Sequence, residues 1–195
     1  IGADARLAAN ALAGGNGGGF GGVWTDLGGP HEVTYYGFYF KTDPDYEQHP
    51  VLTKLAWFQV PINSIFIAMT GQSSFNITLA WQWPDMDADN SHLGYVGSGQ
   101  IYGTQSFQRG QWILVEVLYK PSTTKTSQDG VFKSWVNGAY NGGTMALNTP
   151  DGYATGRLKT RYANNLTIWG GTGGTKTRDS NLYWDHWRIA VGNSL

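Results

Sequence analysis

The 195-residue chain has no cysteine and only three glutamates, Glu32, Glu47 and Glu116. Without cysteine it forms neither disulfide bridges nor thiolate metal sites. Positive charge is not in excess either, because 13 lysines and arginines meet 14 aspartates and glutamates, for a net charge of −1. Such a chain has no general attraction for phosphate backbones or anionic lipids, so a nucleic-acid partner is disfavoured. No apolar run approaches the roughly 20 residues of a membrane span, and no membrane insertion is expected.

Glycine and aromatic residues are abundant instead. The chain has 28 glycines, and aromatic residues make up 14% of it, the same share as all charged residues together. This composition favours a β-rich secreted or cell-surface domain that meets neutral, hydroxyl-rich ligands over a cytosolic enzyme. Since the sequence begins at Ile1 and not at methionine, we expect a processed or excised piece, and any signal peptide would lie outside it.

Runs of apolar and aromatic residues, separated by turn residues, predict strands. Pro84 and Pro121 each end a run, and Asn137-Gly138 is typical of a hairpin turn. The predicted strands are 33–42, 52–60, 65–70, 75–83, 112–120, 131–136, 166–169 and 182–191. Because no convincing helical periodicity lies between them, they predict an all-β fold, an antiparallel two-sheet β-sandwich or jelly roll, with residues 33–195 as one domain.

Residues 1–32 are expected to form an N-terminal extension with a glycine-rich segment. Gly17-x-Gly19-x-x-Gly22 matches the dinucleotide-binding fingerprint in form. That fingerprint needs a strand before it and a helix after it, and neither is predicted here. The segment is therefore interpreted as a linker or loop.

Alternation along the predicted strands sorts the side chains onto two faces. In 112–120, Val115 and Val117 lie on the core face and Glu116 on the other. In the last strand the same rule places Asp185 inward and Trp184 outward. The outward side chains combine aromatic rings with polar groups. They are Tyr39, Lys41, Gln82, Glu116, Lys133, Trp135, Trp184, His186 and Arg188.

This combination is what a carbohydrate-binding surface requires. A flat aromatic ring covers the apolar C–H face of a sugar, and fixed donors and acceptors satisfy its hydroxyl groups. We therefore predict that the outward set binds carbohydrate. The alternative is that these rings only complete the core or lie on a convex outer surface.

Residues 109–117 (RGQWILVEV) and 129–138 (DGVFKSWVNG) read as a hairpin, and residues 183–191 (YWDHWRIAV) as a closing strand. Together they resemble the concanavalin A-like lectin/glucanase superfamily, with a closing strand similar to those of laminarinase-type glucanases and related polysaccharide lyases. The resemblance spans about residues 33–192. It implies two curved antiparallel sheets with a polysaccharide as ligand, and it leaves catalysis open because one fold serves many functions.

Binding is better supported than catalysis. The Glu-x-Asp-x-x-Glu motif of the retaining glucanases is missing, and glycoside hydrolysis needs two carboxylates that flank the bond. A polysaccharide lyase acting on a uronate-containing glycan is chemically easier to assemble, because His or Tyr transfers the protons and Lys or Arg neutralises the uronate. An arginine-rich strand and a Gln-x-His strand, which alginate lyases have, are absent. The candidate residues are Tyr39, Lys41, His49, Lys54, His186 and Arg188.

Asp85, Asp87 and Asp89 alternate in one loop, as ligands do in calcium-binding loops. The loop lacks the glycine of the sixth position, and its twelfth position is Val96. A structural calcium ion and a solvated acidic turn are the two alternatives. No other cofactor is required.

The sequence thus favours a carbohydrate-recognition domain of a secreted or surface-displayed protein, with a polysaccharide as its partner. The first alternative is a polysaccharide lyase. The second is a structural or adhesion domain of a surface filament or virion, which self-associates through its aromatic face.

Overall fold

The structure is a computed structural model that describes residues 24–59, 65–86, 92–124, 126–149, 151–152, 156–157, 159–164, 168–170 and 174–192. Its strands are β1 (Trp24–His31), β2 (Val33–Thr42), β3 (Thr53–Gln59), β4 (Ile65–Thr70), β5 (Phe75–Met86), β6 (His92–Phe107), β7 (Ile113–Lys120), β8 (Gly130–Val136), β9 (Ala139–Leu147), β10 (Asp151–Gly152), β11 (Gly156–Arg157), β12 (Thr160–Asn164), β13 (Ile168–Trp169) and β14 (Leu182–Gly192). Among the described residues, no helix is long and apolar enough to cross a membrane.

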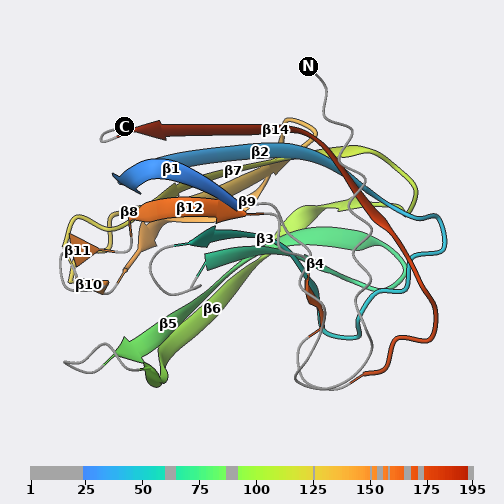
Figure 1. Ribbon diagram of the computed structural model, residues 1–195, viewed down its shortest axis with the longest axis horizontal. Coiled ribbons are helices and arrows are strands. Elements are labelled where there is room, and N and C mark those ends of the chain that lie inside the picture. Colours follow the sequence, from blue (N-terminus) through green and yellow to red (C-terminus); the bar gives the residue numbers. More distant parts are fainter. Residues whose placement is uncertain are drawn as a thin grey trace.

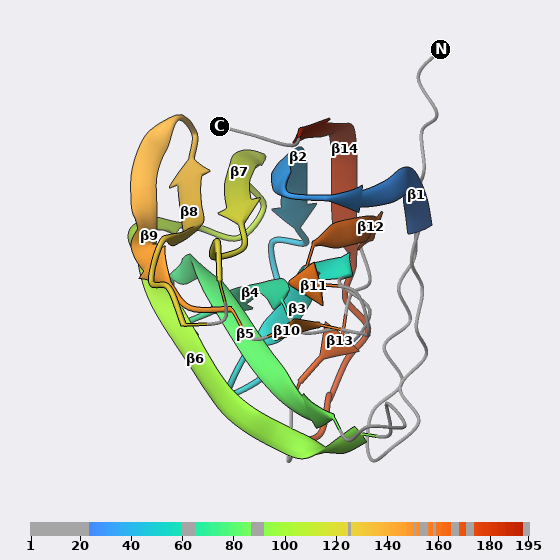
Figure 2. The same cartoon turned by 90° about the vertical axis from the view of Figure 1, so that its left-hand side faces the viewer.

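The strands form two main antiparallel sheets. Sheet A has the order β1-β12-β3-β4-β5-β6, with β13 also paired to β3, and sheet B has the order β14-β2-β7-β8-β9. The sheets lie one above the other as two layers (Figures 1 and 2). The predicted all-β sandwich of the jelly-roll type is confirmed.

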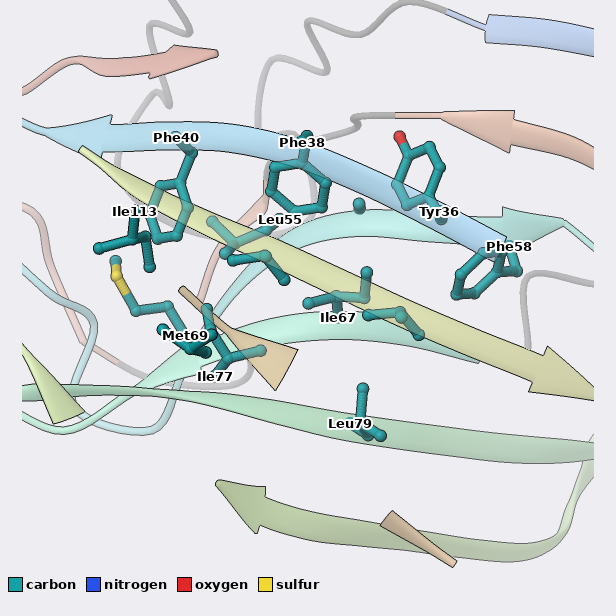
Figure 3. Packing of buried hydrophobic residues seen from close by; sticks show 14 of the residues in the cluster. Tyr36, Phe38, Phe40, Leu55, Phe58, Ile67, Met69, Ile77, Leu79 and Ile113 are labelled. Carbon is teal, nitrogen blue, oxygen red and sulfur yellow. The ribbon is translucent and has the colours of Figure 1, made fainter. Parts of the chain in front are cut away.

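The core lies between the inner faces of the two sheets. Tyr36, Phe38 and Phe40 project from β2 toward Ile67 and Met69 of β4 (Figure 3). All five side chains are at most 1% exposed. Burying each large apolar side chain in this way contributes roughly 1.5–3 kcal/mol to the stability of the fold. This layer of rings and aliphatic groups fills the space between the two sheets.

Two strands of sheet A do not show the signals used to predict strands. Within the described residues, sheet A already includes β1, which precedes residue 33 and pairs with β12. Residues 1–23 lie outside the described residues, so the predicted division of the chain at residue 33 stays a prediction. Strand β1 contains Gly28, Gly29 and Pro30, which have low strand propensity, so residue propensities do not predict it. Strand β6 has 16 residues and is rich in glycine and polar residues, and it forms because β5 offers it a long partner.

Strand β5 also continues beyond its predicted end. The register between β5 and β6 shifts between Trp83 and Pro84, so a proline is accommodated where regular pairing is interrupted.

One buried asparagine joins the two sheets along the β6 and β9 edges. The Asn141 side chain donates to the backbone oxygen of Ile77 (2.9 Å) and to Ser134 Oγ (3.0 Å). Its Oδ1 accepts a hydrogen bond from the backbone N–H of Gln105 (3.0 Å). Since Asn141 is fully buried, these bonds satisfy polar groups that water cannot reach.

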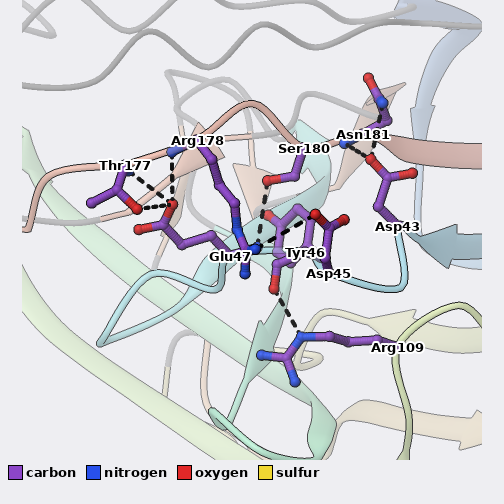
Figure 4. Close-up of polar contacts among 9 residues, drawn as sticks. All are labelled: Asp43, Asp45, Tyr46, Glu47, Arg109, Thr177, Arg178, Ser180 and Asn181. Carbon is purple, nitrogen blue, oxygen red and sulfur yellow. Dashed lines mark hydrogen bonds and ion pairs between the residues drawn. The ribbon is translucent and has the colours of Figure 1, made fainter.

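A polar network fastens the segment before β14 to the loop after β2 (Figure 4). Glu47 Oε2 accepts hydrogen bonds from the backbone N–H of Thr177 (2.8 Å) and of Arg178 (3.1 Å). On the other side of the loop, Arg109 Nε donates to the backbone oxygen of Tyr46 (2.8 Å). Burial tends to raise the pKa of Glu47, but these hydrogen bonds outweigh it and hold that pKa below its ordinary value.

Candidate functional site

The outer face of sheet B, on the side away from the core, collects most of the predicted site residues. Along β7 and β8 the side chains alternate between buried and half-buried, which leaves Glu116, Lys133 and Trp135 on this outer face. On β2 the same alternation turns Tyr39 and Lys41 outward. The face assignment made for these three strands is confirmed.

One cross-strand row runs across all five strands of this face. Arg188 of β14 pairs with Gly37 of β2, which pairs with Glu116 of β7. Glu116 pairs with Trp135 of β8, which pairs with Tyr140 of β9. Directly opposed residues of antiparallel strands project on the same side, so two charged groups and two large rings stand in one line. The rings of Trp135 and Tyr140 meet edge to face at 6.2 Å, and Tyr140 is 51% exposed.

Tyr35 lies beside this row and was not predicted. Its hydroxyl donates a short hydrogen bond to Glu116 Oε1. The phenol end of the ring lies over Gly37, where a Cβ atom would stand 3.5 Å from it. Burial, the hydrogen bond to Glu116 and the negative charge of Glu116 raise the pKa of Tyr35 to about 12, against the smaller opposite effect of Arg188.

A lysine lies between two rings farther along the face. Lys41 Nζ is 5.1 Å from the centroid of the Trp112 ring and 5.0 Å from that of the Tyr183 ring. The Tyr183 hydroxyl donates to Asp43 Oδ1 (2.8 Å). Burial would raise the pKa of Asp43, but hydrogen bonds from Asn181 and Tyr183 and the charge of Lys41 lower it overall. Trp112 is 47% exposed, so this cation–π arrangement offers a ring at the surface.

The predicted faces of β14 are only partly correct. The pairing of β14 with β2 shifts register between Asp185 and Arg188, and His186 has a left-handed φ of 50°. The shift reverses the alternation in the first half of the strand. Trp184 is therefore packed in the core, 8% exposed, so its predicted outward position is wrong, whereas Asp185 is exposed instead of turned inward.

His186 does stand at the surface, as predicted. Its ring meets that of Tyr39 edge to face at 5.9 Å, and its Nδ1 lies 2.9 Å from Asp185 Oδ2. Tyr39, Lys41, Glu116, Lys133, Trp135, His186 and Arg188 thus share the outer face of sheet B.

Two other predictions fall elsewhere. Gln82 belongs to β5 in sheet A and so does not share the outer face of sheet B. The side chain of Asp85, and all of Asp87 and Asp89, lie outside the described residues. The calcium site therefore stays a prediction.

The structure adds four aromatic residues to the predicted set on this face: Tyr35, Trp112, Tyr140 and Tyr183. Strict alternation around the buried Tyr36 would have identified Tyr35. Tyr140 follows the Asn137-Gly138 turn, and mirroring the hairpin register would have placed it opposite Trp135. The outward position of Tyr183 depends on the register shift in β14, and no feature of the sequence signals that shift.

The outer face of sheet A carries a second, separate cluster. Trp57 pairs with Phe66, and both are buried away from the main core. Lys54 Nζ lies 4.9 Å from the centroid of the Trp57 ring and 4.8 Å from that of the Phe66 ring. Burial lowers the pKa of Lys54, because the charged ammonium group is partly removed from water.

No family model and no curated protein matches the sequence. Solved structures do match the fold. An endo-β-1,4-glucuronan lyase from the fungus Trichoderma reesei aligns with a TM-score of 0.63 at 15% identity, over 93% of this chain and 78% of that one. An alginate lyase variant in complex with an alginate trisaccharide aligns with a TM-score of 0.56 at 14% identity, over 94% of this chain and 79% of that one.

The binding domain of botulinum neurotoxin serotype C1 is also similar, with a TM-score of 0.50 at 11% identity. The alignment covers 84% of this chain and 34% of the neurotoxin chain. These neighbours include both enzymes that act on polysaccharides and a binding domain. The chain therefore shares the β-sandwich fold of the two polysaccharide lyases to which it is similar, and the jelly-roll fold implied by the resemblance is confirmed.

Proposed function

We propose that the chain is a carbohydrate-recognition domain of a secreted or surface-displayed protein, which binds a polysaccharide across the outer face of sheet B. The observation that supports this most directly is the row of Arg188, Glu116, Trp135 and Tyr140, in which two charged groups are followed by two aromatic rings. Such a surface stacks on the C–H faces of sugars while it hydrogen-bonds their hydroxyls. The similarity in fold to proteins that act on polysaccharides is consistent with this proposal.

A glycan array followed by titration calorimetry tests the proposal. Trp135→Ala and Tyr140→Ala should each weaken binding of an array-positive glycan about tenfold or more, because stacking on a ring is lost. Tyr102→Ala is the matched control, since Tyr102 is 61% exposed but belongs to sheet A. Circular dichroism should show all three variants folded. Equal affinities for the wild type and both ring variants would refute the assignment of the face.

A polysaccharide lyase is a second candidate, and Lys54 is the observation that favours it. A lysine with a lowered pKa is unprotonated in a larger fraction of molecules near neutral pH than an ordinary lysine, and is therefore more often available as a base. In a lyase, the base takes the C5 proton of a uronate, the C4–O bond breaks, and a C4–C5 double bond forms while the leaving oxygen is protonated.

An ultraviolet assay for the unsaturated uronide product decides between the two. Under the lyase hypothesis, wild type forms product from glucuronan or alginate and Lys54→Met does not. Binding without product supports the recognition domain. Neither binding nor product, with association of the chains in analytical ultracentrifugation, would instead support the structural or adhesion domain.

A further inference from the structure

The cross-strand row on the outer face of sheet B has a gap between the side chains of Arg188 and Glu116. In the cross-strand row, the position between Arg188 and Glu116 is occupied by Gly37, which has no side chain. Arg188 and Glu116 stand two strands apart, a backbone separation of about 10 Å. That distance leaves room for one sugar ring with a hydrogen bond of about 2.8 Å at each side.

Tyr35 provides a floor for this gap. The phenol end of its ring is held over Gly37, with Cε1 and the hydroxyl oxygen each 3.5 Å from the position of a Cβ atom. The hydrogen bond to Glu116 fixes the ring in this orientation. A sugar placed between Arg188 and Glu116 would therefore lie on an aromatic surface whose rotation is already restricted, which lowers the entropic cost of binding.

The two ends of the gap have opposite chemistry. Glu116 uses one carboxylate oxygen for Tyr35, and within the described part of the chain its other oxygen has no hydrogen-bond donor. It can accept hydrogen bonds from sugar hydroxyls. At the other end, the exposed Arg188 makes no hydrogen bond or ion pair with any described residue, so its fork of N–H groups is available to an anion.

The charged side chains of the surrounding face also favour an anionic ligand. Its strands carry four cationic side chains and two carboxylates on the outer side, although the whole chain has a net charge of −1. The cations are Lys41, Lys120, Lys133 and Arg188, and the carboxylates are Glu116 and Asp185. Positive charge is thus concentrated on a face of a chain that has no overall excess of it.

We propose that the gap over Gly37 is a subsite for one acidic sugar residue, whose anionic group binds Arg188 while its hydroxyls bind Glu116. This inference rests on the proposed carbohydrate-binding function of the same face. The anionic group is a carboxylate or a sulfate ester, both of which match the planar guanidinium fork.

The test compares three oligosaccharides by titration calorimetry at about 0.15 M salt, where long-range charge effects are screened. The probes are an oligomer of β-1,4-linked glucuronic acid, the matching cello-oligosaccharide, and a cello-oligosaccharide sulfated at O6. They differ only in the group at C6. We expect at least one acidic probe to bind about ten- to a hundredfold more tightly than the neutral one, as one charge-assisted pair allows. The preferred acidic probe identifies the carboxylate or the sulfate as the anion.

Variants then locate the effect. Arg188→Gln should remove the preference for the acidic probe, so that the acidic and neutral probes bind the variant within about threefold of each other. Arg178→Gln is the matched control, because Arg178 is an exposed arginine paired with Asp45 away from this face (3.5 Å). Gly37→Val should weaken binding at the subsite, because its branched side chain would displace the Tyr35 ring that covers Gly37. The backbone φ of Gly37 is not left-handed and a Cβ atom there meets only ordinary contacts, and circular dichroism checks that the variant folds.

The outcomes separate the two proposals. If all three probes bind equally and Arg188→Gln changes nothing, the acidic subsite is refuted while carbohydrate binding survives. If no glycan binds on the array or in the titrations, both proposals are refuted.

Discussion

The hydroxyl group of Tyr35 on β2 donates a hydrogen bond to the carboxylate of Glu116 on the neighbouring strand β7. Two features of the sequence allow it. The pairing of Gly37 with Glu116 brings the carboxylate beside a position without a side chain, and the Tyr35 ring occupies that space. A tyrosine that faces outward is thereby turned along the sheet surface instead of into solvent.

Glu116→Gln should lower the pKa of Tyr35 from about 12 part of the way toward 10.0. The substitution removes the negative charge that opposes ionisation of the phenol, whereas burial, the largest cause of the shift, remains. A pH titration of the tyrosine 13Cζ resonances by NMR measures this directly. A pKa that stays at about 12 in Glu116→Gln would show that burial alone sets it.

The same raised pKa gives a stability prediction with a definite sign. Above pH 10 the unfolded chain loses the Tyr35 proton while the folded chain retains it, so the free energy of unfolding falls as pH rises from 10 to about 12. Below pH 10 Tyr35 contributes no slope. Urea unfolding at pH 9 and 11 should show a smaller alkaline loss for Tyr35→Phe than for wild type.

Asn141→Ala should destabilise the fold by about 2–3 kcal/mol, because it leaves the buried oxygen of Ile77 and the N–H of Gln105 without partners. Chemical denaturation at neutral pH gives the value. Asn148→Ala is the control, since Asn148 is exposed and its loss should cost no more than about 0.5 kcal/mol. Equal losses for the two variants would contradict the role of Asn141 as the bridge between the sheets.

Most side chains were assigned to a face of the sandwich from the period-two alternation of the strands, and this assignment is correct where the strands are regular. It placed Glu116 and Trp135 on one face because β7 and β8 pair without interruption there. It failed at Trp184, where the register shift reverses the faces of one half of β14. The shift depends on a single residue in a left-handed conformation, and the histidine at that position gives no local warning.

The other features that the sequence did not predict depend on pairing between strands. Strand β6 contains few residues with high strand propensity, and it becomes a strand because β5 and β9 lie beside it. The pairing of Arg188 with Gly37 joins segments about 150 residues apart in the sequence. No local pattern reveals such a pair, so the candidate site could be predicted as a set of residues but not as an ordered row.

The left-handed φ of His186 predicts a strong dependence on residue type. His186→Val should destabilise the fold by about 1–2 kcal/mol, because a β-branched side chain clashes with the backbone in this conformation. His186→Gly should be close to neutral, since glycine adopts the conformation without strain but gains freedom in the unfolded chain. Ala190→Val is the control for adding a β-branched residue to an exposed, regular position of the same strand. Thermal unfolding in which the two valine variants behave alike would contradict this account.

Lys54→Met should raise the melting temperature at pH 7, even though it removes a cation from two aromatic rings. Burial lowers the pKa of Lys54, so the folded chain holds this proton less tightly than the unfolded chain does. At neutral pH the charged ammonium therefore costs stability, and the cost is relieved as pH rises through the folded pKa toward 10.5. The advantage of Lys54→Met over wild type should accordingly be present at pH 7 and smaller at pH 10.5. Scanning calorimetry across this range measures both. A melting temperature that falls at pH 7 would mean that the contacts of the ammonium with Trp57 and Phe66 outweigh its desolvation.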